Sequence, residues 1–137
     1  MFRKVVETCI YSSELEKMKN FYLNIIGLQL VSEEAGRHVF LKAGKSMLLI
    51  FNPDSTSNKN QSTFPPHGAI TPPASVHFAL EIEKEGYEDA KYMLIKNKID
   101  IEKEVSWGSG ETNSIYFRDP ACNLVEFITR GNWPVED

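Results

Sequence analysis

The sequence has few cysteines, no long apolar run and no excess of basic residues, and each absence excludes a class of protein. The two cysteines, Cys9 and Cys122, are too few for a disulfide scaffold and lack metal-site spacing, so we expect reduced thiols. No apolar run approaches the roughly 20 residues that span a bilayer, and residues 1–7 lack the apolar stretch of a signal peptide. We therefore expect a cytoplasmic protein with no membrane partner.

The charge of the chain argues against nucleic acid as a partner. Its 15 Lys and Arg residues are scattered among 19 Asp and Glu residues, which gives a net charge of -4. A protein that binds a phosphate backbone usually gathers basic residues on one face. With 137 residues, 42% of them hydrophobic, the chain is expected to form one globular domain over residues 1–137.

The first half of the chain alternates between strand and helix patterns. Residues 4–11 have the period of two that predicts a strand. A helix is expected next, because Ser13 and Glu16 form a capping-box pair, apolar residues recur at helical spacing, and Gly27 is a natural stop. Three shorter strands are predicted after it, at residues 28–32, 38–42 and 47–52. This half therefore has the order βαβββ.

The second half repeats this order. We predict a strand at residues 75–82, a helix at 87–96, and strands at 99–105, 114–117 and 123–129. The expected ends of the two helices, Gly27 and Asn97, have the same separation in sequence as Glu7 and His77. Glu7 and His77 therefore occupy equivalent positions in the two halves. The half-modules span about residues 4–52 and 75–130. The linking loop, residues 53–74, is rich in Ser, Asn, Thr and Pro, and we expect it to form a partial lid over the site.

Three polar residues stand out on these strands. His77 shares a face with Ala79 and Glu81, while the opposite face of its strand is apolar and suited to cover by a helix. Glu126 alternates with apolar neighbours, and Glu7 shares a face with a valine and a cysteine, so we expect both carboxylates in buried surroundings. An unpaired buried carboxylate costs several kcal/mol, so each needs a cationic partner or a metal ion.

One imidazole and two carboxylates suit a divalent cation. Such ligands fit a six-coordinate Mn, Fe, Co, Ni or Zn ion with open positions for water and substrate. Taken singly, a strand Glu is often a solvated edge residue and a lone His a hydrogen-bonded structural one. However, Glu7 and His77 lie on the first strand of each half and Glu126 on the last strand of the second, positions that pairing of the halves would bring together.

Two motifs resemble the vicinal oxygen chelate superfamily, which includes glyoxalase I, extradiol dioxygenases and bleomycin-resistance proteins. The run from Tyr116 to Glu126, YFRDPACNLVE, is similar to the family ending Y-F-R-D-P-x-G-N-x-x-E, whose last residue binds the metal. The segments Glu14-Leu15-Glu16, Asn20-Phe21-Tyr22 and Ile26-Gly27-Leu28 look like the family's "D-L-…-F-Y-…-L-G-L" pattern. The resemblance implies an α+β fold in which two βαβββ half-modules form a cupped mixed β-sheet with helices outside.

The resemblance also implies a ligand set, with two departures. The family's metal ligands fall on Glu7, His77 and Glu126, whereas its fourth ligand falls on Leu49 or Ile50, both apolar. In the turn where the family usually has glycine, this chain has Cys122. If that turn requires a positive φ, Cys122 is strained there by about 1 kcal/mol or more.

Two classes of function follow from the resemblance. The first is a metal-dependent enzyme, with isomerase or lyase chemistry favoured over dioxygenation, in which the ion chelates two vicinal oxygens of a small substrate and Glu126 or Glu7 moves the proton. The second is a metal-free protein that binds a small molecule or antibiotic. In either class we expect a homodimer.

Four further residues are candidates for substrate binding. Arg37 could hold a substrate carboxylate, and His38 opens a strand that, by the resemblance, lines the cup. His67, in the long loop, could act as acid, base or extra ligand, and Trp107 could form an apolar wall. The alternatives are an exposed turn arginine, a solvated loop histidine, and an interface or core tryptophan.

Overall fold

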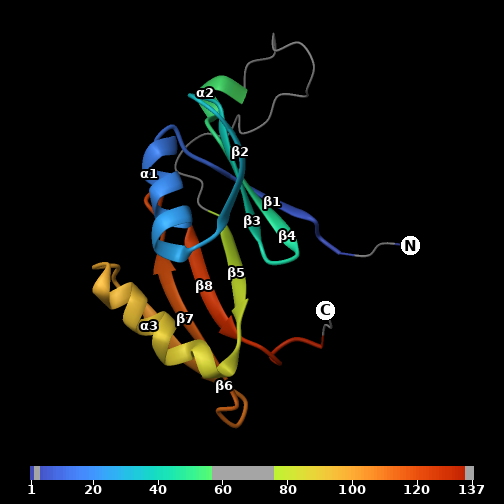
Figure 1. Ribbon diagram of the computed structural model, residues 1–137. Helices are drawn as coiled ribbons and strands as arrows, with labels where there is room; N and C mark the ends of the chain where they lie inside the picture. The colour runs from blue at the N-terminus through green and yellow to red at the C-terminus, as the bar shows by residue number, and fades with distance from the viewer. Residues whose placement is uncertain (2–3, 57–75, 135–137) are drawn as a thin grey trace. The chain divides into compact units, whose positions relative to one another are not determined.

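The computed structural model describes residues 1, 4–56 and 76–134. The chain divides into two compact units, which we call the first unit (Met1–Ala74) and the second unit (Ser75–Asp137). The described strands form two four-stranded sheets, one in each unit (Figure 1). The packing of both units into one domain stays a prediction. No helix among the described residues is long and apolar enough to cross a membrane.

The first unit has the predicted βαβββ order. Its sheet has the strand order β1-β4-β3-β2, with β1 parallel to β4 and the other pairs antiparallel. A short helix, α2, occupies the start of the predicted loop. The elements are β1 (Glu7–Tyr11), α1 (Leu15–Lys19), the π-helix η1 (Asn20–Ile26), β2 (Gln29–Glu34), β3 (His38–Ala43), β4 (Ser46–Phe51) and α2 (Pro53–Thr56).

The start of α1 differs from the prediction, and its end agrees. The predicted capping box of Ser13 and Glu16 is wrong, because the N-cap residue is Glu14 and no side chain caps the helix. Instead, the backbone N–H of Glu14 donates to the Oγ of Ser12, so the serine one position earlier fixes the turn into the helix. At the other end, Gly27 has a φ of 91°, a left-handed conformation that glycine adopts without strain, and it ends η1 as predicted.

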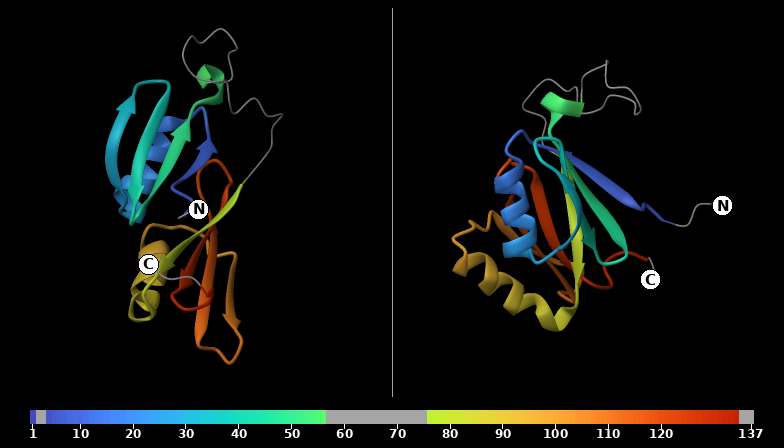
Figure 2. Two further views of the ribbon diagram at one scale, coloured as in Figure 1. Left: turned by 90° about the vertical axis from the view of Figure 1, so that its right-hand side faces the viewer. Right: turned by 45° about the horizontal axis from the view of Figure 1, so that its top comes forward.

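The second unit repeats the architecture (Figure 2). Its sheet has the order β5-β8-β7-β6, with β5 parallel to β8 and the other pairs antiparallel. The predicted helix over residues 87–96 is confirmed, whereas β6 begins later than the predicted residue 99. The elements are β5 (His77–Ile82), the 3-10 helix η2 (Lys84–Gly86), α3 (Tyr87–Lys96), β6 (Lys103–Trp107), β7 (Thr112–Arg118) and β8 (Leu124–Thr129).

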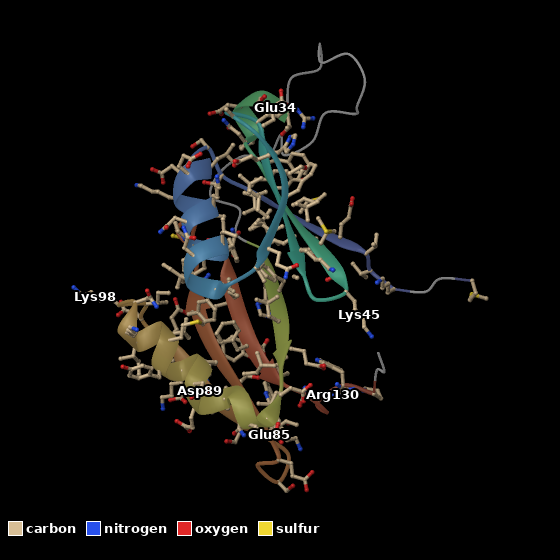
Figure 3. The ribbon with its side chains drawn as sticks, in the orientation of Figure 1. Glu34, Lys45, Glu85, Asp89, Lys98 and Arg130 are labelled. Atoms are coloured by element: carbon tan, nitrogen blue, oxygen red, sulfur yellow. The ribbon has the colours of Figure 1, made fainter. Side chains whose placement is uncertain are left out.

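The two faces of the second sheet differ in character. One face carries fully buried apolar side chains from β7 and β8, including Phe117 and Phe127, whose rings lie 4.7 Å apart. Leu94 of α3 is also fully buried. Glu85 and Asp89 project outward from η2 and α3, away from the strands (Figure 3). The opposite face of the sheet carries the polar residues singled out in the sequence.

A hydrogen-bonded turn joins β7 to β8 and positions the start of β5. The buried Asp119 accepts hydrogen bonds on Oδ1 from the backbone N–H groups of Ala121 and Asn123. The Oδ1 of Asn123 in turn accepts a hydrogen bond from the backbone N–H of Val76, directly before His77. The motif from Asp119 to Asn123 therefore fixes the place where His77 enters its strand.

Cys122 of this turn has a φ of 65°, so the strain expected from its sequence position is present. A left-handed conformation costs a residue with a Cβ about 1–2 kcal/mol. Replacing Cys122 with Gly is therefore expected to raise the free energy of unfolding by about 1 kcal/mol, as measured by urea denaturation. Cys122→Ala, which removes the thiol and keeps the Cβ, should give no comparable gain. Equal stability of the two variants would contradict this account.

Both cysteines are free thiols. This confirms the expectation of reduced cysteines. Cys9 is half-buried, and burial, with the Glu7 carboxylate next, raises the pKa of its thiol. A raised pKa keeps the thiol protonated and makes it a poor nucleophile. Cys9 is therefore a packing residue on the face of β1.

Candidate functional site

The pairing of β5 with β8 brings His77 and Glu126 together. His77 pairs with Leu124, and Ala79 pairs with Glu126. Because paired residues share a face of the sheet, His77 and Glu126 lie on the same face as diagonal neighbours. Ala79, the smallest of the four side chains, lies directly beside Glu126. The second unit thus forms a histidine–carboxylate pair from residues far apart in sequence.

The hydrogen bonds of His77 define which ring nitrogen faces the carboxylate. Its Nδ1 lies 3.0 Å from the carbonyl oxygen of Leu124. A carbonyl oxygen only accepts, so Nδ1 carries a hydrogen and donates it. Its Nε2 lies 3.3 Å from Oε2 of Glu126. In the neutral ring these two atoms are both acceptors, so the contact requires a proton or a bound cation.

Glu126 is buried, with 5% of its surface exposed. Its Oε1 accepts a hydrogen bond of 2.6 Å from the Oγ of Ser114, and that Oγ accepts one of 2.8 Å from the indole N–H of Trp107. Within the described part of the second unit, no Lys or Arg side chain forms an ion pair with Glu126. The expected cationic partner is therefore either protonated His77 or a metal ion.

Ser114 and Tyr116 were missed by the sequence analysis. Tyr116 pairs with Glu126 across β7 and β8, and its ring stacks on His77 with centroids 6.2 Å apart. Burial raises the pKa of the Tyr116 phenol, and the adjacent Glu126 carboxylate raises it further. The phenol therefore stays protonated beside the carboxylate. The available signal was the alternation of β7, in which Ser114 and Tyr116 share one face and apolar residues the other.

Glu7 lies on β1 in the first unit, and its surroundings were predicted wrongly. Glu7 is exposed, and Val5, which was expected to share a buried face with it, has 78% of its surface exposed. The reason is that Val5 precedes β1 and that β1 is an edge strand of its sheet. The place of Glu7 beside His77 and Glu126 stays a prediction.

Within neither unit do three or more His, Cys, Asp or Glu side chains of the described residues gather closely enough to hold a metal ion. Of the three predicted ligands, His77 and Glu126 lie together in the second unit, and metal binding by them stays a prediction.

Arg37 and His38 belong to an aromatic cluster on the first sheet. The Nη1 of Arg37 donates to Nδ1 of His38 at 2.6 Å, and the guanidinium carbon lies 5.8 Å from the ring centroid of Phe51. The His38 ring stacks on Phe40, with centroids 4.0 Å apart. Arg37 is half-buried, so the alternative of an exposed turn arginine is wrong. Its role in binding substrate stays a prediction.

The other two predicted binding residues have different outcomes. Trp107 lies at the end of β6 with 38% of its surface exposed, and its indole N–H is used in the hydrogen bond to Ser114. Its ring therefore remains partly open to solvent while its polar atom is fixed. His67 and most of the expected lid lie outside the described residues.

The environment of His38 predicts a pH dependence of stability. Burial lowers the pKa of its imidazole, the neighbouring Arg37 guanidinium lowers it further, and Glu34 opposes the shift. The unfolded chain therefore takes up this proton at a higher pH than the folded chain. The free energy of unfolding should fall as the pH drops below about 6.5, where an unfolded histidine protonates.

His38→Gln should show a smaller fall than the parent, because glutamine does not titrate. The measurement is urea unfolding of both proteins at about pH 8 and about pH 5.5, on either side of the ordinary histidine value. The two proteins differ only at residue 38, so the difference isolates His38. The same fall in both proteins would contradict the assignment.

Comparison with known proteins decides the family. The model of the Glyoxalase/Bleomycin resistance protein/Dioxygenase superfamily matches residues 4–127. The chain belongs to this superfamily. A crystal structure of lactoylglutathione lyase from Agrobacterium tumefaciens is 32% identical, with a TM-score of 0.87, and the match covers 97% of this chain and 98% of that one.

More distant members of the superfamily share the fold. A putative glyoxalase family protein from Bacillus anthracis is 18% identical over 96% of this chain and 98% of its own, with a TM-score of 0.70. A glyoxalase/bleomycin resistance protein/dioxygenase from Nocardioides is 18% identical over 100% and 91%, with a TM-score of 0.71. The predicted superfamily and α+β fold class are therefore confirmed.

The strand register identifies which residue replaces the fourth ligand expected for the superfamily. In the second unit, Glu126 pairs with the residue two positions after His77. In the first unit, the residue two positions after Glu7 is Cys9, and it pairs with Leu49. Leu49, rather than Ile50, is therefore the counterpart of Glu126. Its buried apolar side chain offers no ligand atom.

Proposed function

We propose that this chain is a metal-dependent enzyme of lyase or isomerase type, in which Glu7, His77 and Glu126 hold one divalent cation. The observation that carries the proposal is the contact between two acceptors, Nε2 of His77 and Oε2 of Glu126, with Nδ1 of His77 committed to a backbone carbonyl. Such a backbone hydrogen bond is the usual way in which a protein fixes the tautomer of a metal-binding histidine.

The residues present fit a cation, with Glu7 as the proposed third ligand. Two carboxylates and one imidazole are ligands for Mn²⁺, Fe²⁺, Co²⁺, Ni²⁺ or Zn²⁺. Glu7 is exposed on an edge strand of the first unit, so its carboxylate is free of packing contacts that would keep a cation away. A bound cation would polarise substrate oxygen atoms and stabilise the negative charge that develops on them.

The chain's own residues supply the proton transfer. Glu126 is buried and its Oε2 lies beside Nε2 of His77, so it is the proposed base that takes a proton from substrate carbon and returns it. Glu7 is the alternative base. Tyr116, whose phenol stays protonated, lies beside this carboxylate on the neighbouring strand.

The proposed substrate is a small molecule with neighbouring oxygen atoms. The relative at 32% identity is a lactoylglutathione lyase, so we propose a thiohemiacetal of an α-oxo aldehyde as the first substrate to test. In that reaction Glu126 would move a proton between two adjacent carbons, and the product would be a thioester. Arg37, His38, His67 and Trp107 are proposed to bind the rest of the substrate.

Metal analysis of the purified protein tests this proposal. We expect about one divalent ion per chain, removable by a chelator and restored by titration with Mn²⁺, Ni²⁺ or Zn²⁺ in a calorimeter. Restored protein should convert the thiohemiacetal into thioester, followed by ultraviolet absorbance. The control variant is Glu81→Gln, which removes an exposed carboxylate from the same face of β5. A chain that binds no metal would overturn the proposal.

A second candidate is a metal-free protein that binds a planar small molecule. The observation that favours it is the cluster of rings on the first sheet, where Phe40, Phe51 and His38 contact one another and Tyr11 stacks on Phe51. Aromatic faces of this kind suit a flat ligand. Absence of metal together with a thermal shift on addition of an aromatic antibiotic would favour this candidate.

We also propose that the chain is a homodimer. Neither unit assembles three potential metal ligands from its described residues, so a site can be completed by contact between units of the same chain or of two chains. Sedimentation at micromolar concentration measures the mass. A monomer would contradict the dimer and would leave the metal site to the two units of one chain.

A further inference from the structure

We propose that Trp107 and Ser114 are positioning residues that give the two carboxylate oxygens of Glu126 different roles. Oε1 is held by the Ser114 hydroxyl, and Oε2 is the oxygen that faces His77 and the proposed cation. This inference rests on the proposed function of Glu126. It adds a role for two residues that neither contact the cation nor react.

Each hydrogen bond of this chain has a defined direction. An indole N–H can only donate, so Trp107 Nε1 donates to Ser114 Oγ over 2.8 Å. The Ser114 hydroxyl accepts this bond on one of its lone pairs and donates its single proton to Glu126 Oε1 over 2.6 Å. The polarity of the chain from Trp107 to Ser114 to Glu126 is therefore fixed.

This polarity has a chemical consequence. Because Oε1 accepts the serine proton, this oxygen of the carboxylate is held within the protein. The oxygen that faces His77 Nε2, at 3.3 Å, is therefore Oε2. The same bond prevents rotation of the carboxylate and presents Oε2 to a cation as a single ligand atom.

Burial and strand register hold Trp107, Ser114 and Glu126 in these hydrogen-bonded positions. Ser114 is fully buried and Glu126 nearly so, and a hydrogen bond of 2.6 Å is in the range of a hydroxyl donating to a charged carboxylate. Val105 is the strand partner of Ser114, which places Trp107 diagonally across from the serine. Hydrogen-bonded groups around a metal ligand typically contribute a factor of about 10 to 100 in metal affinity.

The test uses Trp133→Phe as background, so that Trp107 is the remaining one of the two tryptophans and gives a single indole N–H signal in proton NMR. Ser114→Ala and Glu126→Gln are then introduced separately. In the metal-free protein, both should shift the Trp107 indole resonance, since each alters the chain of hydrogen bonds. Thr129→Ala is the matched control.

Thr129 is a suitable control because its buried hydroxyl also accepts a hydrogen bond, from the backbone N–H of Asn113, and lies on β8 without a bond to Glu126. Thr129→Ala therefore loses a buried hydroxyl contact of the same kind. It should leave the indole resonance in place. Zn²⁺ affinity, measured by calorimetry, should fall about 10-fold or more in Ser114→Ala relative to Thr129→Ala.

Two results would overturn the inference. One is an indole resonance that Glu126→Gln leaves unchanged, since the carboxylate would then not be part of the chain. The other is equal loss of Zn²⁺ affinity in Ser114→Ala and Thr129→Ala, since the loss would then reflect stability alone. If the parent binds no Zn²⁺, the proposed function fails, and the NMR comparison still decides whether Trp107 and Ser114 orient Glu126.

Discussion

Replacing His77 with Ala is expected to abolish metal binding and leave the chain folded. The imidazole provides the Nε2 atom that faces Glu126, and no other nitrogen ligand of the described second unit lies at this position. Its side chain is 49% exposed, so little packing is lost with it. Loss of a direct ligand should weaken Zn²⁺ or Mn²⁺ binding by more than the roughly 100-fold that marks the upper end for supporting residues.

The measurement is metal content after gel filtration, together with a calorimetric titration and a circular dichroism spectrum. Glu81→Ala is the matched control, because it truncates an exposed side chain on the same face of β5 to the same residue. The control should keep both the metal and the fold. Unchanged metal content in His77→Ala would remove the histidine from the site and favour the metal-free binding protein.

Replacing Glu126 with Gln is expected to lower turnover more than metal affinity. Glutamine keeps the shape of the side chain and one oxygen ligand, so the cation should still bind at raised concentration. It cannot act as a base, and loss of a general base lowers a rate by about 10²-fold or more. At saturating metal, conversion of the thiohemiacetal should therefore fall by at least that factor.

The role of Glu126 is decided by separating the loss of turnover from the loss of metal affinity. Turnover is measured at several metal concentrations until it no longer rises, and Glu81→Gln serves as the control for removal of a nearby carboxylate. If saturated Glu126→Gln matched the parent rate, Glu126 would not be the base, and Glu7 would become the residue to test. If neither His77→Ala nor Glu126→Gln changed metal content, the chelate hypothesis would fall.

Local patterns were sufficient for most of the secondary structure. The alternation around His77 predicted a strand with an exposed polar face and a more covered apolar face, and β5 has that pattern. Gly27 and Asn97 were expected to end their helices, and both are the C-cap residues. These predictions succeed because side-chain alternation and helix termination depend on neighbours a few residues away.

The predictions of the helix cap and of the burial of Glu7 were wrong, because both features depend on contacts between distant residues rather than on spacing along the chain. The pair of Ser13 and Glu16 has capping-box spacing, yet Ser12 makes the hydrogen bond, because the direction of the chain leaving β1 decides which hydroxyl reaches the backbone. Glu7 was expected in buried surroundings because of its neighbours in sequence. It is exposed, because β1 is an edge strand and Val5 lies before it.

The sequence by itself determined the βαβββ repeat, the superfamily motif around Glu126, and the face on which each polar residue lies. The tertiary structure decided which strands are neighbours and in what register, and hence that Nδ1 of His77 meets the carbonyl of Leu124, 47 residues away. It also decided that Ser114 and Trp107 hold one oxygen of Glu126. The physical reason is that hydrogen bonds between strands join residues whose separation along the chain has no periodic signature, whereas each strand's alternation is local.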